Sequence, residues 1–266
     1  MKDSELKELK ERIREAELLL IGVGEDMEYD WSALIEDQRY QEIQEEIGDR
    51  EEYIWIIPFL QKMILQRFEQ DRWRIAYKNL SNILAEKNYF VVSLFMDDYI
   101  YESGINESRI VTPCGGFRKM QCDYNCLHIL DPVRRDSYDA VLRYSRKEIP
   151  LKDMQEPLCA SCGSKLRFNQ LGVSKYAEEG YLDRWNEYTK WLQGTVNKKL
   201  CVLELGVGME YPTIIRFPFE KIVLYNQKAF IYRVHQVLYQ LGEGIGDRGR
   251  SIQEDPVDFL CRFEGV

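Results

Sequence analysis

The fold of this chain is decided by the run Leu18-Leu19-Leu20-Ile21-Gly22-Val23-Gly24. Four consecutive large aliphatic residues predict a strand that is buried on both faces, as the strands of parallel sheets are. A buried strand that ends in Gly-x-Gly is typical of the first turn of a dinucleotide-binding fold, because glycine lets the backbone approach a phosphate. The third glycine of the full motif is missing, so the other strands have to support this interpretation.

Three further apolar runs predict strands, and two of them end beside glycine or an acidic residue. They are residues 89–95, followed by Met96-Asp97-Asp98; residues 199–205, followed by Gly206-Val207-Gly208; and residues 230–234. Residues 60–87 have a helical pattern and predict one long helix, which Pro58 separates from the run 54–57. Strands that alternate with helices predict an α/β fold, Rossmann-like, with a mostly parallel sheet and a ligand crevice at the carboxyl ends of its strands.

Four cysteines in two pairs predict a zinc site. Cys122 and Cys126 form the first pair, and Cys159 and Cys162 form the second, with Gly163 directly behind it. Two short loops that each carry two thiolates supply the tetrahedral sulfur ligands that Zn²⁺ prefers. Because sulfur fills all four positions, such a zinc stabilises a fold and leaves no place for substrate. Four reduced buried cysteines, or a redox Cys-x-x-Cys, remain as alternatives.

The cysteine pairs predict a small inserted module within a single α/β domain. We expect a Rossmann-like lobe formed by residues 1–113 and 170–266, and an inserted zinc-ribbon module formed by residues 114–169. Neither a linker nor an internal repeat interrupts this arrangement.

Composition limits the possible partners and surroundings. The chain has 266 residues, and 36 basic against 45 acidic side chains give a net charge of -9, which argues against nucleic acid as a partner. No apolar run approaches the length of about 18 residues that a membrane span needs, and residues 1–6 contain no apolar signal core. The seven cysteines are an odd number and predict reduced thiols in the cytoplasm.

The order of these motifs, from about residue 15 to residue 262, resembles that of a sirtuin. Three runs are similar to the macrodomain-linked, class M branch of that family: Gln121-Cys122, Leu203-Glu204-Leu205-Gly206-Val207-Gly208-Met209 before Pro212-Thr213, and Ile215-Arg216-Phe217-Pro218-Phe219. The resemblance implies a lobe that binds NAD or ADP-ribose and a structural Zn²⁺. It also implies cleavage of the nicotinamide ribose bond and a protein acceptor, such as a lipoyl-carrier protein or a macrodomain protein.

The same resemblance implies cofactor-binding roles for residues at the strand ends. They are Gly22, Gly24, Asp26, Asp97, Gly206, Gly208, His235 and Asp255. Asp97 falls where the family holds the nicotinamide carboxamide. His235 falls near the adenosine ribose, where the family usually has asparagine, and Asp255 matches an acidic residue close to adenine.

The chain departs from the family at three places. The family turn Gly-Ala-Gly-x-Ser reads here with Glu25 and Asp26 at its end, where carboxylates satisfy the helix dipole and repel a pyrophosphate by an amount on the order of a few kcal/mol. Phe95 replaces an asparagine and cannot form its hydrogen bonds. Cys114 replaces the histidine base, and a thiol with an ordinary pKa of about 8.5 acts as a base only where that pKa is lowered.

These departures leave three functional hypotheses open. In the first, the protein binds NAD or ADP-ribose and has lost ordinary deacylation. In the second, it is an active ADP-ribosyltransferase in which Cys114 is the base or nucleophile, Asp97 holds nicotinamide, and Glu25 or Asp26 is a further acid or base. In the third, it is a zinc-stabilised α/β protein whose acidic crevice binds a cationic, non-nucleotide ligand.

Overall fold

The structure, a computed structural model, describes residues 3–28, 31–67, 71–94, 99–124, 126 and 130–263. The chain divides into two compact units. The first, the parallel-sheet unit, comprises Met1–Glu28, Asp71–Cys114 and Tyr181–Val266. The second, the cysteine unit, comprises Tyr29–Gln70 and Gly115–Gly180. None of the described helices is long and apolar enough to cross a membrane.

A six-stranded sheet forms the centre of the parallel-sheet unit. Its strands are β1 (Leu18–Val23), β2 (Asn88–Ser93), β3 (Ile110–Val111), β7 (Leu200–Leu205), β8 (Phe230–His235) and β9 (Gly249–Gln253). They lie in the order β3-β2-β1-β7-β8-β9, and every neighbouring pair is parallel. This is the strand order of doubly wound nucleotide-binding sheets, and it reverses direction between β1 and β7. The predicted α/β class with a parallel sheet is confirmed.

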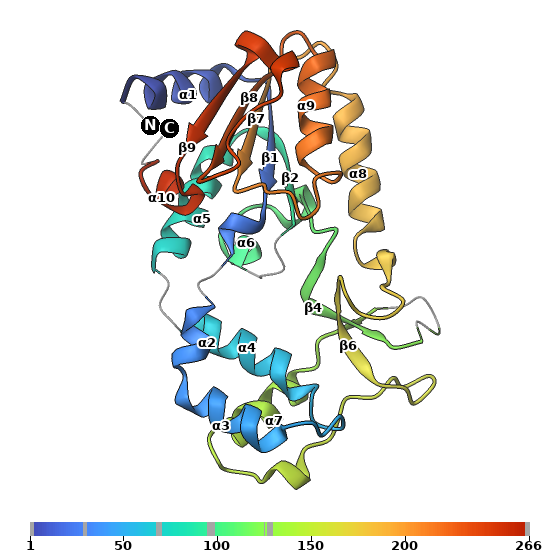
Figure 1. The fold of residues 1–266 in the computed structure, drawn as a ribbon. Coiled ribbons are helices and arrows are strands. Elements are labelled where there is room, and N and C mark those ends of the chain that lie inside the picture. The colour runs from blue at the N-terminus through green and yellow to red at the C-terminus, as the bar shows by residue number, and fades with distance from the viewer. Residues whose placement is uncertain are drawn as a thin grey trace. The chain divides into compact units, whose positions relative to one another are not determined.

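Helices cover both faces of this sheet. They are α1 (Asp3–Glu15), α5 (Asp71–Leu84), α6 (Tyr99–Glu102), α8 (Leu182–Gln193), α9 (Arg216–Tyr225) and α10 (Pro256–Cys261). Within this unit α1, α5 and α10 lie on one side of the sheet, and α8 and α9 lie on the other (Figure 1). All six residues of β1 are buried because helices pack against both of its faces. A Cβ added at Gly22 would lie 2.6 Å from Ile215 Cγ2, so glycine lets the chain before α9 approach β1.

The predicted single long helix over residues 60–87 is wrong. The structure has α4 (Ile56–Arg67) in the cysteine unit and α5 in the parallel-sheet unit, and residues 68–70 between them lie outside the described part. Pro58 does not separate the preceding run from α4, because it occupies the first turn of that helix. A proline is tolerated there, since the first N–H groups of a helix have no intrahelical partner.

The cysteine unit joins helices to a small antiparallel sheet. Its further elements are α2 (Ser32–Glu36), α3 (Gln38–Ile47), β4 (Gly115–Cys122), β5 (Asp131–Pro132), α7 (Arg135–Ser145) and β6 (Leu166–Gln170), and the strand order is β5-β4-β6. Phe59 on α4 connects these layers. Its ring centroid lies 4.8 Å from that of Tyr138 on α7 and 4.6 Å from that of Phe168 on β6. Aromatic contacts of this kind stabilise a core beyond simple burial.

Short 3-10 helices complete the described part. They are η1 (Glu25–Met27), η2 (Glu107–Arg109), η3 (Leu151–Asp153), η4 (Glu178–Gly180) and η5 (Glu243–Arg248).

A buried ion pair joins the two strands β7 and β8. Arg233 Nε donates to Glu204 Oε2 at 2.5 Å, and both side chains are at most 1% exposed. Burial raises the pKa of Glu204, and the Arg233 guanidinium opposes that shift. Arg233 Nη1 also lies 2.7 Å from Glu220 Oε1 on α9. A charge in such a place is tolerated only while its partner remains.

We expect Arg233→Met to lower the free energy of unfolding by about 3–5 kcal/mol, because it leaves the Glu204 carboxylate buried without its cation. The double variant Glu204→Leu/Arg233→Met removes both charges and is expected to regain much of that loss. Urea unfolding followed by circular dichroism measures both variants. A single-variant loss under about 1 kcal/mol would contradict a structural role for this pair.

Candidate functional site

The turns that follow β1 and β7 interlock at the carboxyl end of the parallel sheet. The amide N of Gly24 donates to the carbonyl O of Leu205 at 2.9 Å, and Asp26 N donates to Gly206 O at 3.0 Å. A Cβ at Gly24 would lie 2.4 Å from Gly206 O, so no larger residue fits there. The point between β1 and β7, where strand order reverses, is where open α/β sheets bind ligands.

Gly206 has a conformation that favours glycine. Its φ of +64° lies in the left-handed region, and a Cβ there would lie 2.7 Å from Asp26 Cβ. Gly206 N donates to Val234 O on β8 at 2.8 Å. The predicted residues Gly22, Gly24 and Gly206 therefore lie together at one end of the sheet. Whether they bind a nucleotide remains a prediction.

Glu25 contacts the loop that follows β7. Its Oε2 accepts a hydrogen bond from the amide N of Gly208 at 2.8 Å, and its Oε1 accepts one from Glu210 N at 3.1 Å. The sequence suggested that this carboxylate satisfies the dipole of a following helix. The structure instead has only the three-residue η1 at that position, and the carboxylate binds backbone amides of a different loop.

Asp26 and His235 form a polar contact beside this turn. Asp26 Oδ2 lies 2.9 Å from His235 Nδ1, and His235 is buried. The same nitrogen lies 3.2 Å from the amide N atoms of Val237 and Leu238. An imidazole nitrogen is either an N–H donor or a hydrogen-bond acceptor. With a hydrogen on Nδ1, His235 donates to Asp26, and without it the nitrogen accepts from the two amides. The structure thus brings these two predicted residues together.

Asp255 is engaged in contacts that hold α10 in place. Its Oδ1 accepts from Asp258 N at 2.8 Å, as an N-cap side chain does, and lies 2.5 Å from Arg72 Nη2. Its Oδ2 accepts from Gln236 Nε2 at 2.7 Å. These contacts give Asp255 a structural role. Its contact with adenine stays a prediction.

Arg216 supports the two loops at the carboxyl end, although no pattern in the sequence predicts a role for it. Its Nη1 donates to Val207 O at 2.8 Å, and its Nη2 donates to Leu238 O at 2.9 Å and to Gln240 O at 3.2 Å. Burial lowers the pKa of this guanidinium, and the nearby Arg233 adds to the effect. A single arginine within the otherwise apolar run 215–219 could have indicated a buried side chain with hydrogen-bond partners.

Of the two predicted catalytic residues, the structure describes only Cys114. Asp97 lies outside the described residues. Cys114 is buried, and burial raises its pKa to about 12, with Glu25 and Glu210 adding to the shift. At neutral pH this thiol is protonated. Cys114 could act as a base or nucleophile only if a change in its surroundings lowered this pKa.

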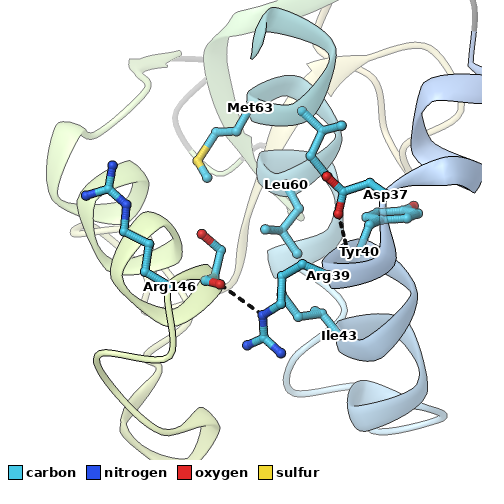
Figure 2. Close-up of a pocket in the computed structure, with 9 residues that line it drawn as sticks. Asp37, Arg39, Tyr40, Ile43, Leu60, Met63 and Arg146 are labelled. Atoms are coloured by element: carbon cyan, nitrogen blue, oxygen red, sulfur yellow. Dashed lines mark hydrogen bonds between the residues drawn. The ribbon is translucent and has the colours of Figure 1, made fainter. Parts of the chain in front are cut away.

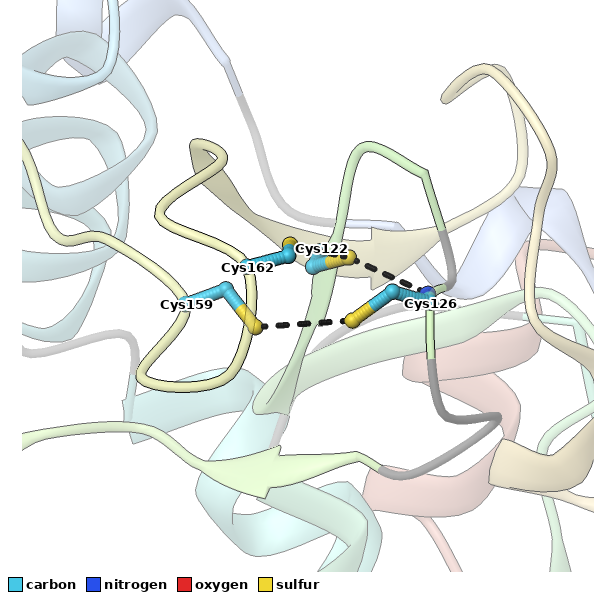
Figure 3. Close-up of side chains that lie close together, drawn as sticks. All are labelled: Cys122, Cys126, Cys159 and Cys162. Carbon is cyan, nitrogen blue, oxygen red and sulfur yellow. Dashed lines mark hydrogen bonds between the residues drawn. The ribbon is translucent and has the colours of Figure 1, made fainter.

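Four cysteine sulfurs gather in the cysteine unit (Figure 3). The Sγ atoms of Cys122, Cys126, Cys159 and Cys162 all lie within 4.8 Å of one another. The Sγ atoms of Cys122 and Cys162 are 3.9 Å apart, and those of Cys126 and Cys159 are 3.8 Å apart. Four sulfurs that each lie about 2.3 Å from a tetrahedral zinc are separated by about 3.8 Å. A disulfide needs a much shorter distance of about 2.05 Å, so the cluster fits a metal and not a pair of disulfides.

The loops around the cluster prepare it for a cation. Cys122 and Cys126 lie at and just after the end of β4, and Cys126 N donates to Cys122 Sγ at 3.3 Å. Gly163 has a φ of +72°, and its amide N donates to Cys159 O at 2.9 Å, which closes the second turn. Hydrogen bonding with Ser164 lowers the pKa of Cys162 to about 6. Hydrogen bonding with Cys162 and Cys122 raises the pKa of Cys126 to about 12, so Cys162 loses its proton more readily than Cys126 does. A zinc ligand is a thiolate, so metal binding releases the protons that remain.

A hollow of about 190 Å³ lies among the helices of the cysteine unit (Figure 2). It is lined by Asp37, Arg39, Tyr40, Ile43, Leu60, Met63, Ile64, Ser145 and Arg146. The Arg39 guanidinium donates to the carbonyl O atoms of Ser145 and Tyr144, and Asp37 accepts from Tyr40 N as the N-cap of α3. Arg39 thus joins α3 to the end of α7, and Asp37 caps α3, so both groups already have partners within the protein.

We expect purified protein to contain about one zinc per chain by elemental analysis. Cys159→Ser is expected to lose most of the metal and to unfold at lower temperature, because binding free energy of a structural metal is folding free energy. Cys201→Ser changes a buried thiol in β7, outside the cluster, and serves as the matched control that keeps its zinc. Less than half an equivalent in the wild-type protein would count against the site.

Comparisons with known proteins agree with this geometry. No protein-family model matches the chain. A probable bifunctional ADP-ribose hydrolase/ADP-ribosyltransferase of Fusarium oxysporum f. sp. cubense is 29% identical over 139 residues, which is 51% of this chain and 23% of the relative. A protein ADP-ribosyltransferase of Staphylococcus aureus is 20% identical over 185 residues, which is 68% of this chain and 57% of the relative. The match thus spans about a quarter of the length of the first relative and somewhat over half of the length of the second.

Solved structures of Sir2 proteins match over nearly the whole chain. Sir2Tm bound to a propionylated peptide has a TM-score of 0.53 at 14% identity and covers 97% of this chain and 96% of its own. A Sir2 structure with a p53 peptide and NAD+ has a TM-score of 0.53 at 15% identity, with 98% and 97% covered. A Sir2 homologue in complex with ADP-ribose has a TM-score of 0.56 at 14% identity, with 99% and 95% covered. The chain therefore has the fold of the sirtuins, and the four-cysteine cluster corresponds to a zinc ribbon in that fold.

Proposed function

We propose that this protein binds NAD+ or ADP-ribose at the carboxyl ends of β1 and β7. The observation that carries the proposal is the interlocked pair of glycine turns at the point where strand order reverses. Open α/β sheets bind their ligands in the crevice at such a switch point, where glycine lets the backbone approach a phosphate. The names of the similar proteins, two ADP-ribosyltransferases and several Sir2 proteins, support a ligand built on ADP-ribose.

The same proposal includes the loss of ordinary deacylation. In the sequence, Phe95 replaces an asparagine that orients the ribose, and Cys114 replaces the histidine base. A buried Cys114 whose pKa is raised to about 12 is a poor substitute for a base that works near neutral pH. The structural zinc stabilises the cysteine unit in this account and takes no part in chemistry.

An active ADP-ribosyltransferase is the second candidate, and the names of the two sequence relatives favour it. In this candidate the nicotinamide bond is cleaved and ADP-ribose passes to a protein acceptor. The resemblance of the sequence to class M sirtuins implies a lipoyl-carrier protein or a macrodomain protein as the acceptor. Asp97 and one carboxylate of the pair Glu25 and Asp26 would then supply the polar groups of the reaction.

We expect millimolar ADP-ribose or NAD+ to raise the melting temperature by about 2–4 °C, because a ligand that binds only the native state stabilises it. Nicotinamide release, measured in the NAD+ samples, separates the two candidates: a shift without release supports a binding protein, and a shift with release supports a transferase. If neither nucleotide changes the melting curve, the proposed ligand is wrong and a non-nucleotide ligand is favoured.

The role of Cys114 has a separate test. We expect Cys114→Ala to change any rate of nicotinamide release by less than about twofold, since its protonated thiol supplies no base. Single-turnover assays of wild type and variant at pH 7 measure this. A loss of about 100-fold or more in the variant would restore Cys114 as the catalytic base or nucleophile.

A further inference from the structure

Glu25 accepts hydrogen bonds from two backbone amides in the loop that follows β7. We call the amide N–H groups of Gly208 and Glu210 the 208/210 amide pair. Each oxygen of the Glu25 carboxylate accepts one of these two donors, at 2.8 and 3.1 Å. Hydrogen bonds from N–H groups to a charged oxygen are stronger than those to a neutral one.

The loop that carries the amide pair is held from three sides. Gly206 N donates to Val234 O on β8, and Asp26 N donates to Gly206 O from the turn after β1. Arg216 Nη1 donates to Val207 O from α9. These bonds fix Gly206 and Val207 at the carboxyl end of β7, directly before the first donor of the pair, the amide of Gly208.

Glu210 adds a second carboxylate to the surroundings of Glu25, and the Arg216 guanidinium is a nearby positive charge. Glu25 and Glu210 both raise the pKa of Cys114, and both raise the pKa of Tyr211 after the larger effect of burial. A phosphate that approached the amide pair would meet the Glu25 carboxylate at the same donors. Two like charges cannot share one pair of donors, so one of them has to leave.

We propose that Glu25 is a tethered competitor for the nucleotide phosphates and thereby determines the phosphate affinity of this site. The inference rests on the proposed binding of NAD+ or ADP-ribose. A carboxylate on the same chain has a high effective concentration at its donors, so a phosphate binds only after displacing it. Ligands without phosphate, such as adenosine, do not compete with Glu25.

Removal of the carboxylate tests this inference. We expect Glu25→Ala to bind ADP-ribose at least about tenfold more tightly than wild type, and to leave the affinity for adenosine unchanged. Glu25→Gln keeps the shape of the side chain, and a smaller gain is expected, because its amide oxygen still accepts one hydrogen bond. Isothermal titration calorimetry measures the affinities, and circular dichroism shows that each variant is folded.

Glu17→Ala is the matched control. The Glu17 carboxylate also accepts a hydrogen bond from a backbone amide, that of Lys199 at 2.9 Å, but it lies at the amino end of the same strands. The substitution removes an equal charge and an equal kind of contact. It is expected to leave the affinity for ADP-ribose within about twofold of wild type.

The outcomes separate this inference from the proposed function. Equal, measurable binding of ADP-ribose by wild type and Glu25→Ala overturns the inference and leaves the proposed function standing. If neither protein binds ADP-ribose, the proposed function fails, and inorganic pyrophosphate is titrated into ¹⁵N-labelled Glu25→Ala. Chemical-shift changes at the amides of Gly208 and Glu210 then support the competition, and unchanged amides overturn it.

Discussion

Close backbone approach between two turns is the constraint on which the candidate site depends. The turn after β1 can hydrogen-bond to the turn after β7 only because Gly24 has no side chain and Gly206 adopts a positive φ. That approach fixes Asp26 beside His235 and Glu25 beside the loop of Gly208. In a doubly wound sheet the same place receives the ligand, so the packing that completes the fold also forms the candidate site.

Much of the parallel sheet was predictable because its strands are buried on both faces. Such strands appear as continuous apolar runs, and each of the four predicted runs contains a strand, although Phe95 at the end of the run 89–95 lies outside the described residues. β9 was missed because its residues Gly249–Gln253 have no apolar run, and β8 recruits them as an edge partner. α7 was missed because the region 131–157 is polar, and only one side of that helix, with Val141 and Tyr144, is buried. Periodicity also failed to show where α4 ends, since an apolar pattern continues into α5.

The candidate site was predictable in its parts and not in its contacts. Cysteine spacing alone was enough to predict the cluster, since few other arrangements place four thiols in two short loops. The glycines were found because they follow strands. The partners of Glu25 lie more than 180 positions away in the chain, and no local pattern reports such a contact. Likewise, the raised pKa of Cys114 follows from burial and neighbouring carboxylates, which only the folded chain shows.

We propose a nucleotide crevice at the carboxyl ends of β1 and β7, in which the Glu25 carboxylate occupies two of the phosphate donors. A crystal structure of the wild-type protein soaked with ADP-ribose tests this most directly. The account predicts diphosphate oxygens within hydrogen-bond distance of the amide N atoms of Gly208 and Glu210, with the Glu25 side chain turned away. A structure in which ADP-ribose is bound elsewhere, while Glu25 keeps both amides, would contradict it.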